Sequence, residues 1–142
     1  MNANMIENSV EIQIPFHDID VMQVAWHGHY AKYLEIARCA LFETINYDVP
    51  EMQTSGYAWP VIDLHIRYAG PLTYNQVLVV FAKLVEWENR LKVEYKICDK
   101  VTGKRLTKAT TVQVAVDIKT HEMLFESPAV LFEKLGIEKI EN

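Results

Sequence analysis

The sequence predicts an α+β fold in which an antiparallel β-sheet wraps around one long central helix. One strand pattern comes first, one long helical pattern follows it, and four further strand patterns fill most of the remaining chain. Short turns separate the four later strands, and such turns join strands that run in opposite directions. The 142 residues are enough for one domain with a substantial core, so we expect a single domain over residues 1–142.

The first predicted strand is marked by strict alternation of apolar and polar residues. Its apolar positions are Val10, Ile12, Ile14 and Phe16. This pattern is typical of a strand with one buried face. Pro15 has no N–H to donate, which favours a sheet edge or a strand end at this point.

A helical period replaces the alternation from Gly28 to about Ile45. The apolar positions are Tyr30, Leu34, Ala37, Leu41 and Ile45, and Tyr33, Ile36 and Ala40 widen the stripe. A helix this apolar should be largely surrounded by other structure. It would be roughly 25 Å long. The following segment, Asn46–Ala58, contains Pro50 and Gly56 and is expected to be a loop with at most a short helical turn.

The second half of the chain is dominated by strand patterns. The predicted strands are Ile62–Tyr68, Val77–Trp87, Leu91–Ile97 and Arg105–Asp117. A short helix is expected near the end, with Ser127 as N-cap, Pro128 as the first helical residue and Gly136 as the stop.

Composition argues against several classes of protein. The net charge of −5 gives no general attraction for nucleic acid or acidic membranes, so we expect neither as a partner. No signal peptide is visible and no apolar stretch is long enough to span a bilayer. Cys39 and Cys98 lack metal-ligand spacing, and two such thiols indicate a reducing compartment, the cytoplasm.

The most informative segment joins the first strand to the helix. Asp18 and Asp20 stand directly after the strand, and His27-Gly28-His29-Tyr30 opens the helix. Such a junction brings carboxylates close to the unpaired N–H groups of a helix start, where a carbonyl can be polarised and attacked. An aspartate before a helix is also a common capping or turn residue.

These residues resemble those of the hotdog-fold acyl-CoA thioesterases. The closest group is similar to 4-hydroxybenzoyl-CoA thioesterase and the YbgC-like enzymes, and the resemblance covers about Val10 to Asp117. It implies a hotdog fold and hydrolysis of an acyl thioester to a carboxylic acid and a thiol. The second aspartate, Asp20, would act in catalysis, and the backbone N–H of His27 would polarise the thioester carbonyl. The His27 side chain would assist.

The expected substrate-binding residues are Trp26, Gly28, Tyr30, Trp59, Asn89 and Arg90. The two tryptophans could line an acyl or aryl pocket, although core packing explains each of them equally well. Arg90 lies where the resemblance places ligand-facing residues, and coenzyme A phosphates need cations. Two departures from the family pattern lie within the site: Gln23 replaces a frequent Gly, and His29 replaces a frequent Asn or Ser.

The residues leave the mechanism open. Asp20 could attack the carbonyl and form a mixed anhydride, or it could deprotonate a water molecule. We expect Asp18 to be structural and to hold the turn or the other strand. A metal site built from His27, His29 and the two aspartates is disfavoured, because no further ligand cluster appears. No metal and no cofactor are therefore expected.

Two other functions are compatible with the same features. The chain could be a non-catalytic module that binds acyl thioesters, or a hotdog dehydratase, because a fold does not determine a function. The thiol carrier could be coenzyme A or acyl carrier protein. Hotdog domains generally place their active sites between subunits, so the resemblance implies a homodimer or a homotetramer. The sequence does not indicate which acyl group is bound.

Overall fold

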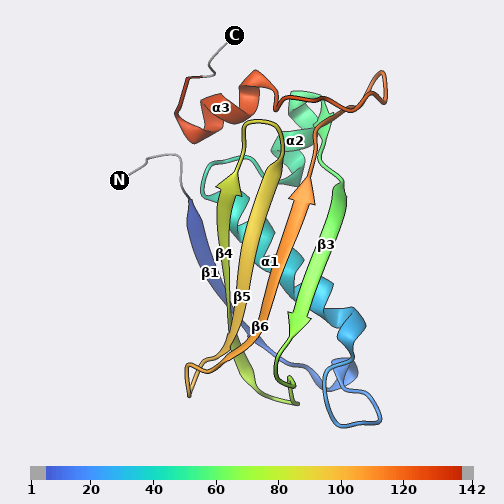
Figure 1. The fold of residues 1–142 in the computed structure, drawn as a ribbon, viewed down its shortest axis with the longest axis vertical. Helices are drawn as coiled ribbons and strands as arrows, with labels where there is room; N and C mark the ends of the chain where they lie inside the picture. Colours follow the sequence, from blue (N-terminus) through green and yellow to red (C-terminus); the bar gives the residue numbers. More distant parts are fainter. Residues whose placement is uncertain (1–5, 139–142) are drawn as a thin grey trace.

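A computed structural model describes residues 6–138; residues 1–5 and 139–142, which the predicted single domain includes, lie outside this part. Its centre is a five-stranded antiparallel sheet with the strand order β1-β4-β5-β6-β3 (Figure 1). The strands of this sheet are β1 Glu7–Gln13, β3 Val61–Tyr68, β4 Val77–Glu86, β5 Leu91–Asp99 and β6 Arg105–Gln113. A small second sheet pairs β2 Tyr57–Ala58 with β7 Val116–Asp117.

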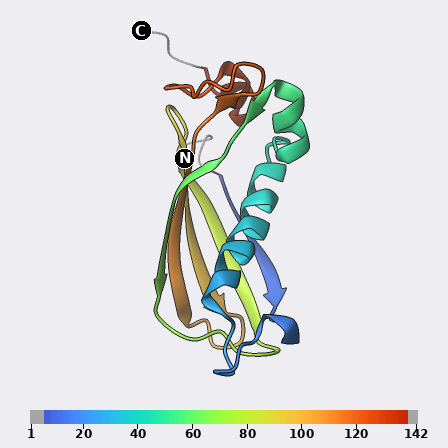
Figure 2. The ribbon, with the colours of Figure 1, turned by 90° about the vertical axis from the view of Figure 1, so that its right-hand side faces the viewer.

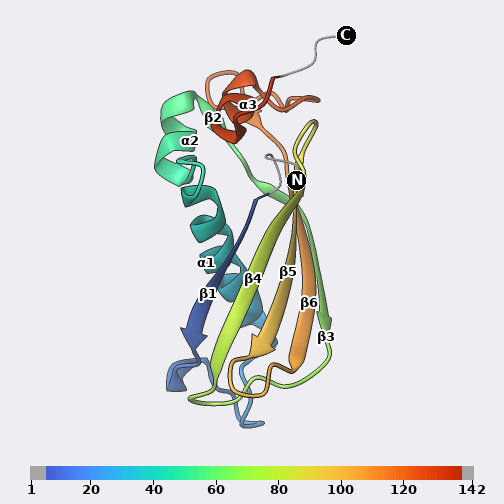
Figure 3. The same ribbon diagram turned by 90° about the vertical axis from the view of Figure 1, so that its left-hand side faces the viewer.

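The long helix α1, Tyr30–Glu43, lies across one face of the sheet, as Figures 2 and 3 show. The shorter helices α2, Val49–Ser55, and α3, Ala129–Leu135, gather at one end of the sheet. The connection from β1 to α1 lies at the opposite end. The predicted order of one strand, one helix and an antiparallel sheet is therefore confirmed.

The core lies between α1 and the inner face of the sheet. From the helix it takes Tyr33, Leu34, Ala37 and Leu41, and from β4 and β5 it takes alternate residues such as Leu78, Val80, Val93 and Ile97. Each of these side chains is almost wholly excluded from water, and burying one such aliphatic side chain contributes about 1.5–3 kcal/mol.

The five-stranded sheet covers only one side of α1. The expectation that other structure largely surrounds this helix is therefore wrong. Ile36, placed in the apolar stripe from sequence, is 44% exposed. The helix is also shorter than predicted. It begins at Tyr30 rather than Gly28, because a separate 3-10 turn, His27–His29, precedes it, and it ends at Glu43 rather than Ile45.

Three other predicted boundaries differ. The first strand ends at Gln13, and Phe16 begins a 3-10 turn, Phe16–Asp18. The last long strand ends at Gln113 and not Asp117, because the Ala115 carbonyl accepts a hydrogen bond from Leu124 instead of a sheet neighbour. Pro128, not Ser127, is the N-cap of α3.

The segment predicted as a loop with at most a short helical turn contains the two-turn helix α2. Asp48 and Glu51 form a reciprocal capping box at its start, and Pro50 lies in its first turn. Gly56 ends it in the left-handed conformation, with φ 93°, and Gly136 ends α3 in the same way, as predicted.

Strand β3 is an edge of the sheet with an apolar face that the rest of the subunit leaves open. It pairs with β6 on one side only. Ile62, Leu64 and Tyr68 are between 45% and 57% exposed. An uncovered apolar edge of this length is a template for pairing with another chain.

Candidate active site

The chain between β1 and α1 folds back on itself as a narrow loop from Asp18 to Trp26. The Trp26 N–H donates to the Asp18 carbonyl at 3.0 Å, and the Asp20 N–H donates to the Val24 carbonyl at 2.9 Å. An isolated β-bridge joins Ile19 to Ala25 between them. The loop therefore returns the chain to the start of the helix with Asp20 near its tip.

Asp20 is partly buried, and one of its oxygens holds the turn. Its Oδ1 accepts the Met22 N–H at 2.8 Å, a typical Asx turn. Within residues 6–138, its other oxygen, Oδ2, has no hydrogen-bond partner. The side chain thus stabilises the turn through Oδ1, and Oδ2 remains available to react.

Gln23, where the family pattern often has Gly, lies at the tip of this loop. Gln23 has φ 66°, in the left-handed region that glycine enters at no steric cost. Its N–H donates to the Asp20 carbonyl at 3.0 Å and closes the turn. A glycine would suit this position better, and Gln23 adopts the same geometry with some strain.

Two N–H groups are free at the start of the helix. The N–H groups of His27 and Gly28 have no hydrogen-bond partner in the described part of the chain, whereas the His29 N–H donates to the Trp26 carbonyl. Both free groups point from the amino end of the 3-10 turn that leads into α1, where the helix dipole is positive. Unpaired N–H groups at a helix start are the kind of donor that can stabilise a developing negative charge.

The His27 side chain is exposed and lies among aromatic rings. Its ring contacts Trp26, with centroids 5.1 Å apart, and Tyr68, with centroids 6.5 Å apart. The Tyr68 hydroxyl donates to the His27 carbonyl at 3.3 Å. Within residues 6–138, no hydrogen bond or ion pair joins the His27 ring to Asp20.

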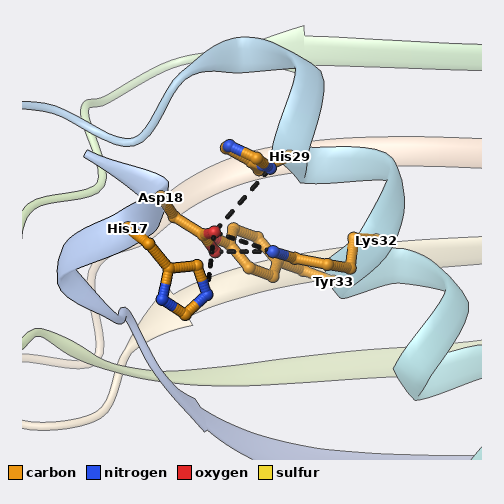
Figure 4. A network of polar contacts seen from close by, with 5 residues as sticks. All are labelled: His17, Asp18, His29, Lys32 and Tyr33. Atoms are coloured by element: carbon orange, nitrogen blue, oxygen red, sulfur yellow. Dashed lines mark hydrogen bonds and ion pairs between the residues drawn. The ribbon is translucent and has the colours of Figure 1, made fainter. Parts of the chain in front are cut away.

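Asp18 is buried and lies at the centre of a network of polar contacts (Figure 4). Its carboxylate accepts hydrogen bonds from the Lys32 ammonium, at 2.8 Å to each oxygen, and from the Tyr33 hydroxyl at 2.6 Å. Two imidazoles flank it, with His17 Nε2 at 3.6 Å and His29 Nδ1 at 3.8 Å from Oδ1. The side chain of Asp18 thus has a structural role, as the sequence indicates, but it bonds α1 rather than the turn or another strand.

The ionised form of Asp18 is favoured despite its burial. Burial alone would raise the pKa of this carboxyl, but the hydrogen bonds from Lys32 and Tyr33 and the charge of Lys32 outweigh it and lower the pKa. Burial, together with the hydrogen bond to Asp18 and the negative charge of Asp18, raises the pKa of the Tyr33 hydroxyl far above its usual value.

The cation bonded to both Asp18 oxygens is the Lys32 ammonium. Within residues 6–138 no group of three His, Cys, Asp or Glu side chains could hold a metal ion. Sequence reasoning missed Lys32, which lies outside the apolar stripe of the helix as one of its few polar residues.

The sequence profile of the thioesterase-like superfamily matches residues 14–135. The chain belongs to the thioesterase-like superfamily. This match confirms the expected family and the expected reaction class, hydrolysis of an acyl thioester.

Individual relatives of this thioesterase are distant. It is 27% identical over 107 residues to the Bacillus subtilis protein named "Putative acyl-CoA thioesterase YneP", covering 75% of this chain and 78% of the relative. A DHNA-CoA thioesterase from Staphylococcus aureus has a similar structure, with TM-score 0.78 and 24% identity over 84% of this chain and 80% of that one. A 1,4-dihydroxy-2-naphthoyl-CoA thioesterase from Synechocystis has TM-score 0.81 and 16% identity over 92% and 96%. These structures confirm the hotdog fold.

The predicted site residues of the thioesterase form two groups at opposite ends of α1. Trp26, Gly28 and Tyr30 lie with Asp20 and His27 at its start; Tyr30 is buried and packs its ring on Tyr68, with centroids 4.6 Å apart. The remaining predicted residues, Trp59, Asn89 and Arg90, lie towards the other end.

Arg90 lies in the exposed turn between β4 and β5 and is engaged with a neighbour. Its guanidinium makes an ion pair with Glu86, with Nη2 at 2.9 Å from the carboxylate. Asn89 precedes it in the same turn and is exposed. Within one subunit the structure does not bring these two residues to Asp20.

Trp59 lines a cavity between α1 and α2 of about 450 Å³. Its indole N–H donates to the Tyr47 hydroxyl at 3.1 Å, and its carbonyl accepts from the Gln113 amide at 2.8 Å. Phe42 and Met52 form other apolar walls, and Arg38 brings a cation to the lining. The cavity borders the start of β3, at the opposite end of that strand from Tyr68.

Within residues 6–138, the structure has no helix that is both long enough and apolar enough to cross a membrane.

Proposed function

We propose that this thioesterase hydrolyses acyl-CoA, with Asp20 as the reacting carboxylate and the N–H groups of His27 and Gly28 as donors to the oxyanion. The observation that carries the proposal is the pair of unpartnered N–H groups at the helix start, beside a loop that bears a half-free carboxylate. Removing one such donor from an oxyanion site typically slows a reaction about 100- to 1,000-fold.

Two reaction routes are consistent with this arrangement. In the first, Asp20 Oδ2 adds to the thioester carbonyl carbon, the C–S bond breaks, CoA leaves as thiolate, and water hydrolyses the mixed anhydride. In the second, Asp20 takes a proton from water, the hydroxide adds to the carbonyl, and the tetrahedral intermediate expels the thiolate. In both, the carbonyl oxygen gains negative charge facing the two N–H groups. The exposed His27 ring would orient water or the carrier.

We propose that the working unit is a homodimer joined through β3. Three exposed apolar side chains support this dimer, because they lie along the free edge of the sheet and a partner would bury them. They are Ile62, Leu64 and Tyr68. Two β3 strands paired about a two-fold axis would run antiparallel, with the end of one beside the start of the other.

Pairing of the two β3 strands would bring the helix start of one subunit close to a cavity in the other. It would place Tyr68 and His27 of one subunit beside the cavity lined by Trp59 in its partner, and both lie on the helix side of the sheet. We propose that this cavity receives the acyl group. Trp59 would then serve in substrate binding, with Asn89 and Arg90 nearer to the cavity than to the reacting atoms.

We propose coenzyme A as the carrier. Several proteins of similar structure are named for CoA thioesters, including a 4-hydroxybenzoyl-CoA thioesterase. The net charge of −5 works against an acidic carrier protein.

We propose the cytoplasm as the location of the protein. Both cysteines are free thiols, which supports a reducing compartment.

The deciding experiment measures thiol release from a panel of acyl-CoAs of different chain length and ring content. Asp20→Asn keeps the size of the side chain and its turn hydrogen bond, and we expect at least a 100-fold loss of kcat. Asp117→Asn is the matched control, because Asp117 holds a similar turn through the Lys119 N–H at 2.8 Å. A wild type that releases no thiol from any acyl-CoA would leave a binding module as the function.

The dimer is tested separately. Leu64→Asp puts a charge on the inner side of the β3 edge, and we expect monomers in sedimentation experiments together with loss of activity. His65→Asp changes the adjacent residue on the other face of the sheet and serves as the control. A Leu64→Asp protein that stays dimeric and active would contradict this interface.

A further inference from the structure

Asp18 joins three parts of the candidate active site at one point. Its side chain bonds Lys32 and Tyr33 in the first turn of α1. Its backbone carbonyl accepts the Trp26 N–H, immediately before the free N–H groups of the helix start. Asp20 follows it by two residues.

The loop that bears Asp20 has few other attachments. Val21 and Met22 at its tip are 94% and 75% exposed. Beyond the loop's own hydrogen bonds, the Ala25 N–H donates to the Leu72 carbonyl at 2.7 Å. The side chain of Asp18, which has no exposed surface, is the main tie between this loop and the helix.

The Asp18–Lys32 ion pair is a poor source of stability, because removing the Asp18 charge from water offsets much of its attraction to Lys32, whose side chain stays 46% exposed. Apolar side chains of similar volume often stabilise a fold as well or better. What the charged network supplies is geometry, since three directed hydrogen bonds meet on one carboxylate and fix its position.

We propose that Asp18 is a positioning residue that, through Lys32 and Tyr33, fixes the Asp20 loop against the helix start. Reaction requires the Asp20 carboxylate and the two N–H groups to face one thioester carbonyl at the same time, and misplacement by about 1 Å can cost about 100-fold in rate. The inference rests on the proposed function for its kinetic consequence, while the geometry of the loop can be tested without substrate.

The test replaces the network with apolar side chains in Asp18→Leu/Lys32→Met. We expect the melting temperature to be kept, kcat to fall about 10- to 100-fold, and KM to change less than threefold. Backbone hydrogen exchange at Trp26 should become at least tenfold faster, because its acceptor is no longer fixed. A merely structural role would instead lower the melting temperature and leave kcat of the folded protein unchanged.

Two further variants keep the test decisive if the double variant does not fold. Tyr33→Phe removes one hydrogen bond at constant shape, and we expect a severalfold loss of kcat and faster exchange at Trp26. Lys100→Met is the control, because it removes an exposed ion pair with Glu11 outside this network. Unchanged kcat and unchanged Trp26 exchange in Tyr33→Phe would overturn the positioning role. Absence of any hydrolysis by the wild type, with faster Trp26 exchange in the variants, would overturn the proposed function alone.

Discussion

The indole of Trp26 packs directly against the backbone of Gly28. A Cβ atom added to Gly28 would overlap the six-membered ring of Trp26, with no room between them. The same indole contacts the rings of His27 and His29, with centroids 5.1 and 5.5 Å away. Gly28 is therefore required by the close approach of this ring and not by its own backbone angles, which are ordinary.

We expect Gly28→Ala to displace Trp26 rather than the helix, because the overlapping atoms are at the outer end of a half-exposed side chain. Overpacking of this kind costs about 1–3 kcal/mol. The free N–H groups beside it should shift, and kcat should fall at least tenfold. The indole N–H resonance of Trp26 in NMR spectra and the steady-state kinetics measure the two effects.

The matched test is the double variant Trp26→Ala/Gly28→Ala. Without the ring, the added methyl meets nothing, so the double variant should be as stable as Trp26→Ala alone. If the methyl at position 28 destabilises both backgrounds equally, the Trp26 contact is not the reason for glycine.

Replacing Gln23 should relieve strain at the tip of the Asp20 loop. Gln23→Gly removes a Cβ from a residue at φ 66°, where non-glycine residues cost about 1–2 kcal/mol. The greater freedom of glycine in the unfolded chain offsets part of this gain, so we expect a net stabilisation of about 0.5–1 kcal/mol. Urea unfolding measures it, and a loss of stability would contradict the strained turn. Asn46→Gly, at φ 56° outside the site, is the comparison.

Regular periodicity made most of the fold predictable. The alternation in β3, β4 and β5 and the helical stripe of α1 each come from one buried face, which a single sequence reports directly. The end of β6 was not predictable in this way. Val114 and Val116 continue the strand pattern, but the Ala115 carbonyl bonds Leu124, and that choice depends on how the chain returns after Thr120.

The site was predictable only where it is local. The loop, the Asp20 turn and the helix start lie within 13 residues, so their proximity follows from the sequence. The Asp18–Lys32–Tyr33 network depends on which side of the helix faces the loop, and the period alone does not give this. The place of Trp59, Asn89 and Arg90 at the far end depends on tertiary topology and on the partner subunit we propose.

Cys39 should be an unreactive thiol. Burial, with the charge and hydrogen bond of Asp48, raises the pKa of Cys39 to about 11. At pH 8 only about a thousandth of the thiol is ionised, so alkylation by iodoacetamide should be slow. Asp48→Asn keeps a good N-cap for α2 and removes the charge, and we expect faster labelling in a Cys98→Ser background. Equal labelling rates would show that Asp48 does not act on the thiol.

Lys32→Met should destabilise the protein in a pH-dependent way. The pKa of Asp18 is lowered from its ordinary 3.8 in the folded state, so its ionised form contributes stability above that value and loses it as pH falls further. Without Lys32 the buried carboxylate has no cation bonded to both its oxygens, and we expect a loss of about 2 kcal/mol at pH 7, moderated because the Lys32 side chain is 46% exposed. The difference from wild type should shrink as the pH falls, because burial raises the pKa of a carboxyl that has lost Lys32, so Asp18 is protonated at a higher pH in the variant than in wild type. Urea unfolding at pH 7, 5 and 3 measures this, with Lys100→Met expected to change little at any pH. If Lys32→Met lowers the free energy of unfolding by the same amount at all three pH values, the lysine stabilises the protein through the packing of its aliphatic chain and not through its charge next to Asp18.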